Sequence, residues 1–117
     1  WNVTGPRFKS LHEMFMEQYT ELWTALDEIA ERIRTLGEFA PGSTEQILEH
    51  ATIKPDNSQP DADSMVENLA KGHDMLSTTL KKALDVADEI GDDVTVDLFT
   101  QRMTVSQKTA WMLRSSL

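Results

Sequence analysis

A long run of apolar residues at helical spacing constrains the fold of this chain most. Between Phe8 and Leu36, apolar side chains recur at steps of three and four residues, which places them on one side of a helix of about eight turns. The stripe consists of Phe8, Leu11, Phe15, Tyr19, Leu22, Leu26, Ile29, Ile33 and Leu36. Gly5-Pro6 is typical of a helix start, and Gly37 of a helix end. No segment shows the alternation of a β-strand, so the sequence predicts an all-α fold.

A second stripe runs beside the first on the same predicted helix. Its members are His12, Met16, Tyr19, Trp23, Asp27 and Ala30. A helix with two largely apolar flanks is expected to pack against two different surfaces, one on each flank. We expect the core of the chain to cover one flank and another subunit to cover the other.

The middle of the chain is predicted to hold a long connection with a short helix in it. Ser43 with Gln46 forms a capping box, which predicts a helix of roughly 43–51. Residues 52–62 are rich in turn-forming residues and are expected to be exposed. Ser64 with Glu67 forms a second capping box.

Two more long helices are expected after this connection. The first runs from Ser64 to about Ile90, and Gly91-Asp92-Asp93 ends it and caps the next. The apolar face of the last helix is predicted from Val94, Leu98, Val105, Met112 and Leu117. Trp111 is also expected in the core. Three long helices make an incomplete bundle, so we expect residues 1–117 to be one domain whose first helix lies largely upstream of Trp1.

The charge of the chain narrows its possible partners. There are 11 basic and 20 acidic residues, and the formal net charge is −9. Such a surface repels the phosphates of nucleic acids and attracts cations, so DNA binding is not supported. The absence of cysteine excludes disulfides and thiolate metal sites. No apolar run reaches the ~20 residues that a membrane helix needs, so no membrane partner is expected.

His12, Asp27 and Glu31 are candidate metal ligands on the first helix. At ~1.5 Å per residue, His12 and Asp27 are about 22 Å apart along a straight helix, so the three side chains cannot share an ion within one chain. An antiparallel copy of the helix would place His12 of one chain opposite Asp27 and Glu31 of the other. The alternative is a solvated acidic face, which is the commoner meaning of such a pair.

The proposed pairing of two helices has further consequences. It places a two-fold axis near residues 19–22, so Tyr19, Thr20 and Trp23 would contact their own copies. Carboxylates with imidazole suit iron, because carboxylate oxygens hold both of its valence states. A structural zinc site is disfavoured without more nitrogen or sulfur ligands. His50 and His73 lack acidic partners at ligand spacing, and we expect both on the surface.

Asp92, Asp93 and Asp97 concentrate negative charge at a predicted helix start. The helix dipole favours acidic groups there by about 0.3–1 kcal/mol each. This explains Asp92 or Asp93 but explains Asp97, one turn further on, less well.

Three segments together resemble the Dps family (DNA-binding proteins from starved cells), the miniferritins of bacteria and archaea. They are Trp1-Asn2-Val3-Thr4-Gly5-Pro6 followed by Phe8, Leu11-His12-Glu13 and Phe15; Leu26-Asp27-Glu28-Ile29-Ala30-Glu31-Arg32; and Gly91-Asp92-Asp93-Val94-Thr95. The resemblance implies a ferritin-like four-helix bundle with a short extra helix in the central connection. It also implies a hollow cytoplasmic dodecamer built from two-fold dimers.

The same resemblance implies a function. Dps proteins bind iron(II) at dimer interfaces, oxidise it, preferentially with hydrogen peroxide, and store the ferric mineral, which protects against oxidative stress. The matching ferroxidase ligands are His12 of one subunit with Asp27 and Glu31 of the other. Trp1 matches a tryptophan beside the site.

By the same likeness, Asp92, Asp93 and Asp97 would line pores through which iron enters. The chain departs from the family pattern at two of its positions. Met16 stands where the family often has an aspartate, and a thioether is a weak ligand for a hard cation. Gln101 stands where some members carry a further pore acid.

Two parts of the family pattern lie outside this sequence: the histidine before the tryptophan and the lysine-rich DNA-binding tail. The alternatives are therefore a structural cage with a weakened ferroxidase centre, and a nucleoid-associated protein that uses a basic extension outside this sequence.

Overall fold

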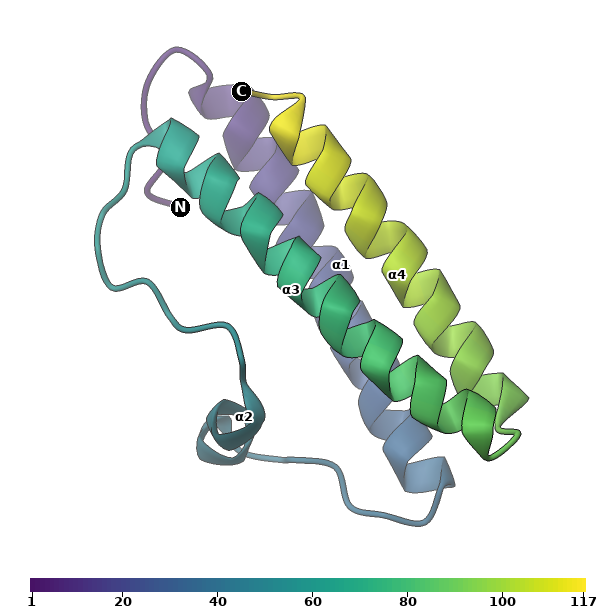
Figure 1. Cartoon of the computed structure of the whole chain (residues 1–117). Helices are drawn as coiled ribbons and strands as arrows, with labels where there is room; N and C mark the ends of the chain where they lie inside the picture. The colour runs from purple at the N-terminus through teal and green to yellow at the C-terminus, as the bar shows by residue number, and fades with distance from the viewer. The chain divides into compact units, whose positions relative to one another are not determined.

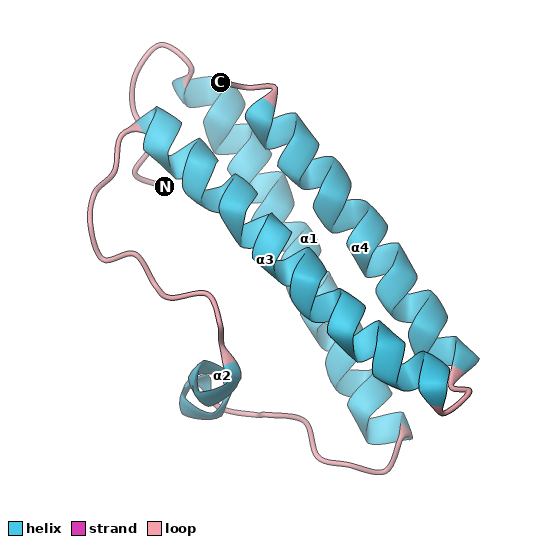
Figure 2. Ribbon diagram, in the orientation of Figure 1, coloured by secondary structure: helices cyan, strands magenta, loops and turns pink.

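The computed structural model describes all residues, 1–117, and every regular element in it is a helix (Figures 1 and 2). The helices are α1 (Phe8–Thr35), α2 (Thr44–His50), α3 (Ala62–Glu89) and α4 (Asp93–Arg114). The all-α prediction is therefore confirmed, with the short helix in the long connection. None of the four helices has the length and hydrophobicity of a membrane-spanning segment. The chain divides into two compact units, residues 1–6 with 57–117 and residues 7–56.

In the first unit, α3 and α4 form an antiparallel pair joined by a tight turn (Figure 1). At the end of α3, the Gly91 amide donates to Asp88 O at 3.0 Å and the Asp92 amide donates to Ala87 O at 2.9 Å. This Schellman motif requires a left-handed residue, and Gly91 has φ +73°. The Asp92 side chain then accepts from the Thr95 amide at 3.1 Å and caps α4, as predicted.

The start of α3 differs from the sequence prediction. Asp61, and not Ser64, is the N-cap, because its carboxylate accepts from the Ser64 amide at 2.8 Å. Hydrogen bonds from the backbone amide and the hydroxyl of Ser64 lower the pKa of the Asp61 carboxyl. The helix therefore begins three residues earlier than the capping box at Ser64 indicated.

The buried face of α4 also differs from the prediction. Its buried residues are Thr95, Arg102, Ser106, Ala110 and Leu113. Of the predicted core residues, Val94, Met112, Leu117 and Trp111 are exposed. The true face is rotated from the predicted one by roughly 100°, one residue step of a helix. Small and hydrogen-bonded side chains allow α4 to pack closely, and a pattern of large apolar residues does not reveal such a face.

The second unit holds α1 and α2. α1 is uninterrupted and ends in a second Schellman motif, in which the amides of Gly37 and Glu38 donate to Arg34 O and Ile33 O at 3.0 and 3.2 Å. Ser43 caps α2 by accepting from the Gln46 amide at 3.2 Å, which confirms that cap. The reciprocal bond of Gln46 reaches the Gly42 amide at 2.8 Å, one residue before the cap.

Candidate metal-binding residues on α1

All three predicted metal ligands lie on α1, and the continuity of this helix sets their separation. His12 is half-buried and stacks on Phe8, with ring centroids 5.2 Å apart and an interplanar angle of 26°. Asp27 and Glu31 are exposed and have no hydrogen-bond or ion-pair partner within the chain. Because they are one turn apart, their carboxylate oxygens can converge on one ion.

One chain presents these ligands as two separate groups. The rise of a helix places His12 about 22 Å from Asp27 along the axis. No three His, Asp or Glu side chains of this chain come close enough to hold a metal ion. A site that contains His12, Asp27 and Glu31 therefore requires a second copy of α1, and this pairing stays a prediction.

The surface of α1 between the two groups is apolar and exposed. On a helical projection at 100° per residue, Met16, Tyr19 and Trp23 lie in the same sector as His12 and Asp27. All three are exposed, Trp23 to 74%. Large exposed side chains at one face typically mark a protein–protein contact. The exposure of Tyr19, Thr20 and Trp23 meets the requirement of the predicted self-contact, which itself stays a prediction.

Trp1 belongs to the other unit. Residues 1–6 group with α3 and α4, where Val3 is buried, while the indole of Trp1 is almost fully exposed. The predicted place of Trp1 beside the metal ligands stays a prediction.

The acidic run at the start of α4 divides into residues of different roles. Asp92 is committed to capping, since its second carboxylate oxygen also accepts from the Thr95 hydroxyl at 2.5 Å. Asp93 is exposed on the first turn, and Asp97 accepts from Gln101 Nε2 at 2.8 Å. Asp93 and Asp97 are thus more available to cations than Asp92, and the pore that they would line stays a prediction.

His73 is not a surface residue, and that prediction is wrong. It is 6% exposed, and its Nδ1 lies 2.9 Å from Ser106 Oγ on α4. The Ser106 hydroxyl donates to His73 O at 3.0 Å, so the hydroxyl oxygen is the acceptor and Nδ1 carries the donated hydrogen. The partner is 33 residues away in sequence, so ligand spacing gave no signal of it. His50 is exposed, as predicted.

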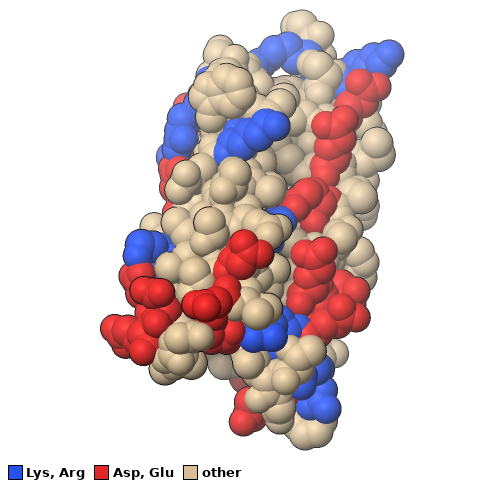
Figure 3. Space-filling view, turned by 90° about the vertical axis from the view of Figure 1, so that its right-hand side faces the viewer, with Lys and Arg blue, Asp and Glu red and all other residues tan.

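The distribution of charge agrees with the composition. Figure 3 shows runs of acidic side chains on the face in view, with the basic side chains scattered and in no large cluster. This face therefore lacks the patch of Lys and Arg side chains with which proteins bind the phosphate backbone of nucleic acids.

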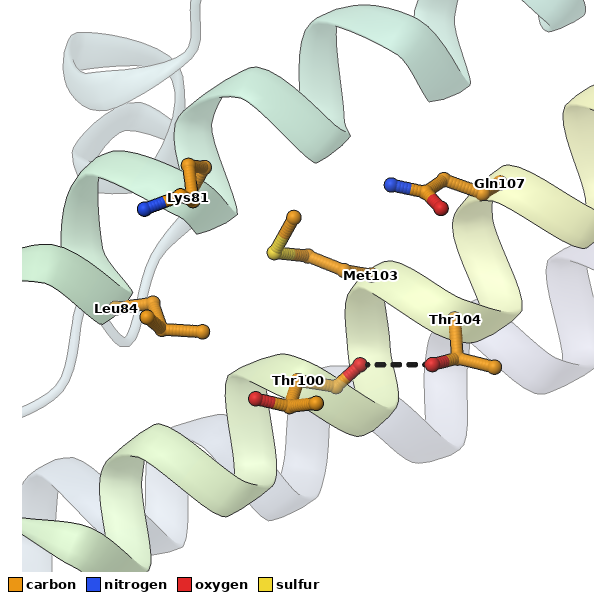
Figure 4. Close-up of a pocket in the computed structure, with 6 residues that line it drawn as sticks. All are labelled: Lys81, Leu84, Thr100, Met103, Thr104 and Gln107. Carbon is orange, nitrogen blue, oxygen red and sulfur yellow. Dashed lines mark hydrogen bonds between the residues drawn. The ribbon is translucent and has the colours of Figure 1, made fainter.

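An open hollow of about 290 Å³ lies on the α3–α4 pair. It is lined by Lys81, Leu84, Thr100, Met103, Thr104 and Gln107 (Figure 4). Thr100 and Thr104 donate their hydroxyls to carbonyl groups of their own helix, at 2.8 and 3.0 Å, and Lys81 pairs with Asp85. Three of the four polar side chains that line the hollow are therefore already engaged within their own helices.

Comparison with known proteins places the chain in a family. The sequence model of the ferritin-like domain matches residues 1–117. DNA protection during starvation protein 2 of Bacillus anthracis is 40% identical over 117 residues, which cover 100% of this chain and 80% of the relative. An uncharacterized low temperature-induced protein of Nostoc sp. is 43% identical, and the match covers 98% of this chain and 65% of that protein. The chain thus spans just under two thirds of the length of this cyanobacterial relative.

Solved structures agree with this placement. The crystal structure of Dps from Staphylococcus aureus matches with a TM-score of 0.97 and 38% identity, covering 100% of this chain and 78% of that one. The fold is that of a ferritin-like four-helix bundle, with α2 as the short extra helix in the central connection. Within the ferritin-like class, the chain belongs to the Dps family.

Proposed function

We propose that this protein is a ferroxidase that binds iron(II) between two copies, oxidises it with hydrogen peroxide and stores the ferric product in a dodecameric cage. The observation that carries the proposal is the placement of His12 and the Asp27–Glu31 pair toward opposite ends of one exposed face of α1. Membership of the Dps family supports it. A solved relative from Vibrio cholerae, 35% identical with a TM-score of 0.93, is described as a member of a superfamily of ferritin-like diiron-carboxylate proteins.

An antiparallel pair of α1 helices completes the site twice. A two-fold axis near residues 19–22 brings His12 of each copy to Asp27 and Glu31 of the other. Burial of Tyr19 and Trp23 at the centre supplies the hydrophobic contact, because aromatic side chains bury large areas at such positions. A contact that also forms the metal site couples assembly to activity.

The ligand set suits the reaction. Asp27 and Glu31 are hard oxygen donors that hold iron(II) and iron(III), and His12 adds a nitrogen donor. Two iron(II) ions each lose one electron, and peroxide takes up both electrons and two protons to form two water molecules. Peroxide is thereby removed without releasing hydroxyl radicals. This accounts for a protective role under oxidative stress in the cytoplasm.

The remaining acidic residues would supply the substrate. The net charge of −9 concentrates cations near the protein surface. Asp93 and Asp97, and to a smaller extent the capping residue Asp92, would draw iron(II) through the pores of the cage.

The test compares two neighbouring acids of α1 in the full-length protein. Asp27→Asn removes a proposed ligand, whereas Glu28→Gln neutralises an exposed residue that points about 100° away on the helix. We expect Asp27→Asn to slow the rise of ferric absorbance after addition of iron(II) and peroxide by about ten-fold or more. Mutation of residues that only hydrogen-bond to metal ligands already lowers metal affinity or activity by about this factor. Glu28→Gln should react like the unaltered protein. Equal rates for all three proteins would remove the proposed site.

A second candidate is a structural cage with a weakened ferroxidase centre, and Met16 is the observation that favours it. It predicts a dodecamer by native mass, with ferric absorbance that rises no faster than in buffer.

Nucleoid association is a further alternative, because relatives carry names such as "DNA protection during starvation protein". The acidic charge of the described chain opposes it.

A further inference from the structure

Met16 occupies a particular place on the exposed face of α1. It follows His12 by four residues, so the two side chains lie on the same face one turn apart. Side chains of a helix lean toward its N-terminus, and the thioether of Met16 therefore leans toward the turn that carries His12. Met16 is 45% exposed in the single chain, so no other part of the chain covers its sulfur fully.

The proposed pairing of two α1 helices adds a second neighbour. If His12 lies opposite residues 27–31 of a second copy, Met16, four residues further along, lies opposite residues 23–27. This range includes Asp27. The sulfur would therefore lie between the imidazole of its own chain and a ligand carboxylate of the other copy, beside the iron.

The thioether itself is a poor ligand there, because sulfur is soft and iron is a hard cation. Hydrogen peroxide changes its chemistry. The sulfur loses two electrons and gains one peroxide oxygen as a sulfoxide, and the other peroxide oxygen leaves as water. The sulfoxide oxygen is a polar donor of the kind that suits iron.

We propose that Met16 is a modification site: peroxide drawn to the interface iron converts its thioether to a sulfoxide, whose oxygen then becomes an additional iron ligand. This inference rests on the ferroxidase function proposed above. The first turnovers of the protein would thus add an oxygen ligand for iron at Met16, whose unmodified side chain has none.

The chain contains its own controls for selective oxidation. Met75 on α3 and Met112 on α4 are 43% and 42% exposed, close to the 45% of Met16, and neither lies on α1. The assembled full-length protein is treated with peroxide alone or with iron(II) and peroxide, and the oxidised fraction of each methionine is measured by peptide mass mapping. Treatment with peroxide alone corrects for the accessibility of each side chain in the assembly.

We expect iron(II) to raise the oxidation of Met16 by about ten-fold relative to Met75 and Met112, because iron holds the oxidant beside it. Ferric absorbance is followed in the same samples. Rapid iron oxidation with equal modification of the three methionines would overturn this inference and leave the ferroxidase function intact. Absence of accelerated iron oxidation would overturn the function and this inference with it.

The ligand role is tested with cobalt(II), which is added after iron and peroxide have been removed. Treated protein should bind cobalt(II) about ten-fold more tightly than untreated protein, because a single contact at a metal site typically changes metal affinity by about this factor. Met16→Leu keeps the apolar bulk and should show no change on treatment. Met16→Asp, which carries an oxygen donor from the start, should bind tightly with or without treatment. Unchanged cobalt binding after selective oxidation of Met16 would exclude the sulfoxide as a ligand.

Discussion

The hydrogen bonds between His73 and Ser106 join α3 to α4, and their contribution to stability can be predicted from their burial. Ser106 is 1% exposed and His73 is 6% exposed, so water cannot replace a lost partner. Ser106→Ala removes the oxygen that accepts from His73 Nδ1. The His73 carbonyl keeps its bond within α3, because each helical carbonyl accepts from the amide four residues on. The loss is therefore centred on one buried donor.

An unsatisfied buried donor costs about 1–3 kcal/mol, and we expect Ser106→Ala to lower the free energy of unfolding by about 2 kcal/mol. Ser115→Ala is the matched control, because Ser115 donates to Trp111 O at 2.9 Å but is exposed. Its effect should stay within about 0.5 kcal/mol. The assay is urea denaturation of both variants at one protein concentration, because assembly makes stability depend on concentration.

A double-mutant cycle refines this prediction. Combining His73→Leu with Ser106→Ala should cost less than the sum of the two single changes, with a coupling of about 1 kcal/mol or more. Equal losses for Ser106→Ala and Ser115→Ala, together with additivity in the cycle, would refute the reasoning.

Two further predictions concern the cap of α3 and the exposed face of α1. The pKa of Asp61 is lowered below its usual 3.8 by the Ser64 hydrogen bonds, so its stabilising effect is complete above the unfolded pKa and is lost as pH falls through the folded pKa. Asp61→Asn should therefore reduce the steepness of acid unfolding below about pH 4, as followed by helical circular dichroism, and an unaltered acid limb would contradict this. Trp23→Asp should shift native mass toward smaller species, because it places a charge at the centre of the proposed two-fold contact. Retention of the full assembly by this variant would argue against an interface centred on Trp23.

Local features of the fold were predictable because their causes lie within a few residues. The caps by Ser43 and Asp92 and the turns at Gly37 and Gly91 each depend on groups at most five residues apart. The start of α3 was missed by three residues because two capping residues are available there, and the Asp61 carboxylate is the one that accepts from the helix, at the Ser64 amide.

The part of the candidate site that lies within one chain was also predictable from the sequence. The sequence places His12, Asp27 and Glu31 on one helix, and the structure confirms that α1 is continuous between them. The exposure of Asp27, Glu31 and Trp23 was expected of an interface and is observed, whereas His12 is half-buried. The completion of the site by a second copy involves no contact within one chain, so it stays a prediction.

The amino-acid sequence by itself determined the helical class, the helix ends at Gly37 and Gly91 and the residues that share the exposed face of α1, because these follow from helical periodicity and from short-range hydrogen bonds. Only the tertiary structure decided which face of α4 is buried, and that His73 is an interior residue while Trp111 is exposed. The physical reason is that burial depends on the surface that a partner helix offers. Close packing against α3 favours Ser106 and Ala110 over the larger apolar residues beside them.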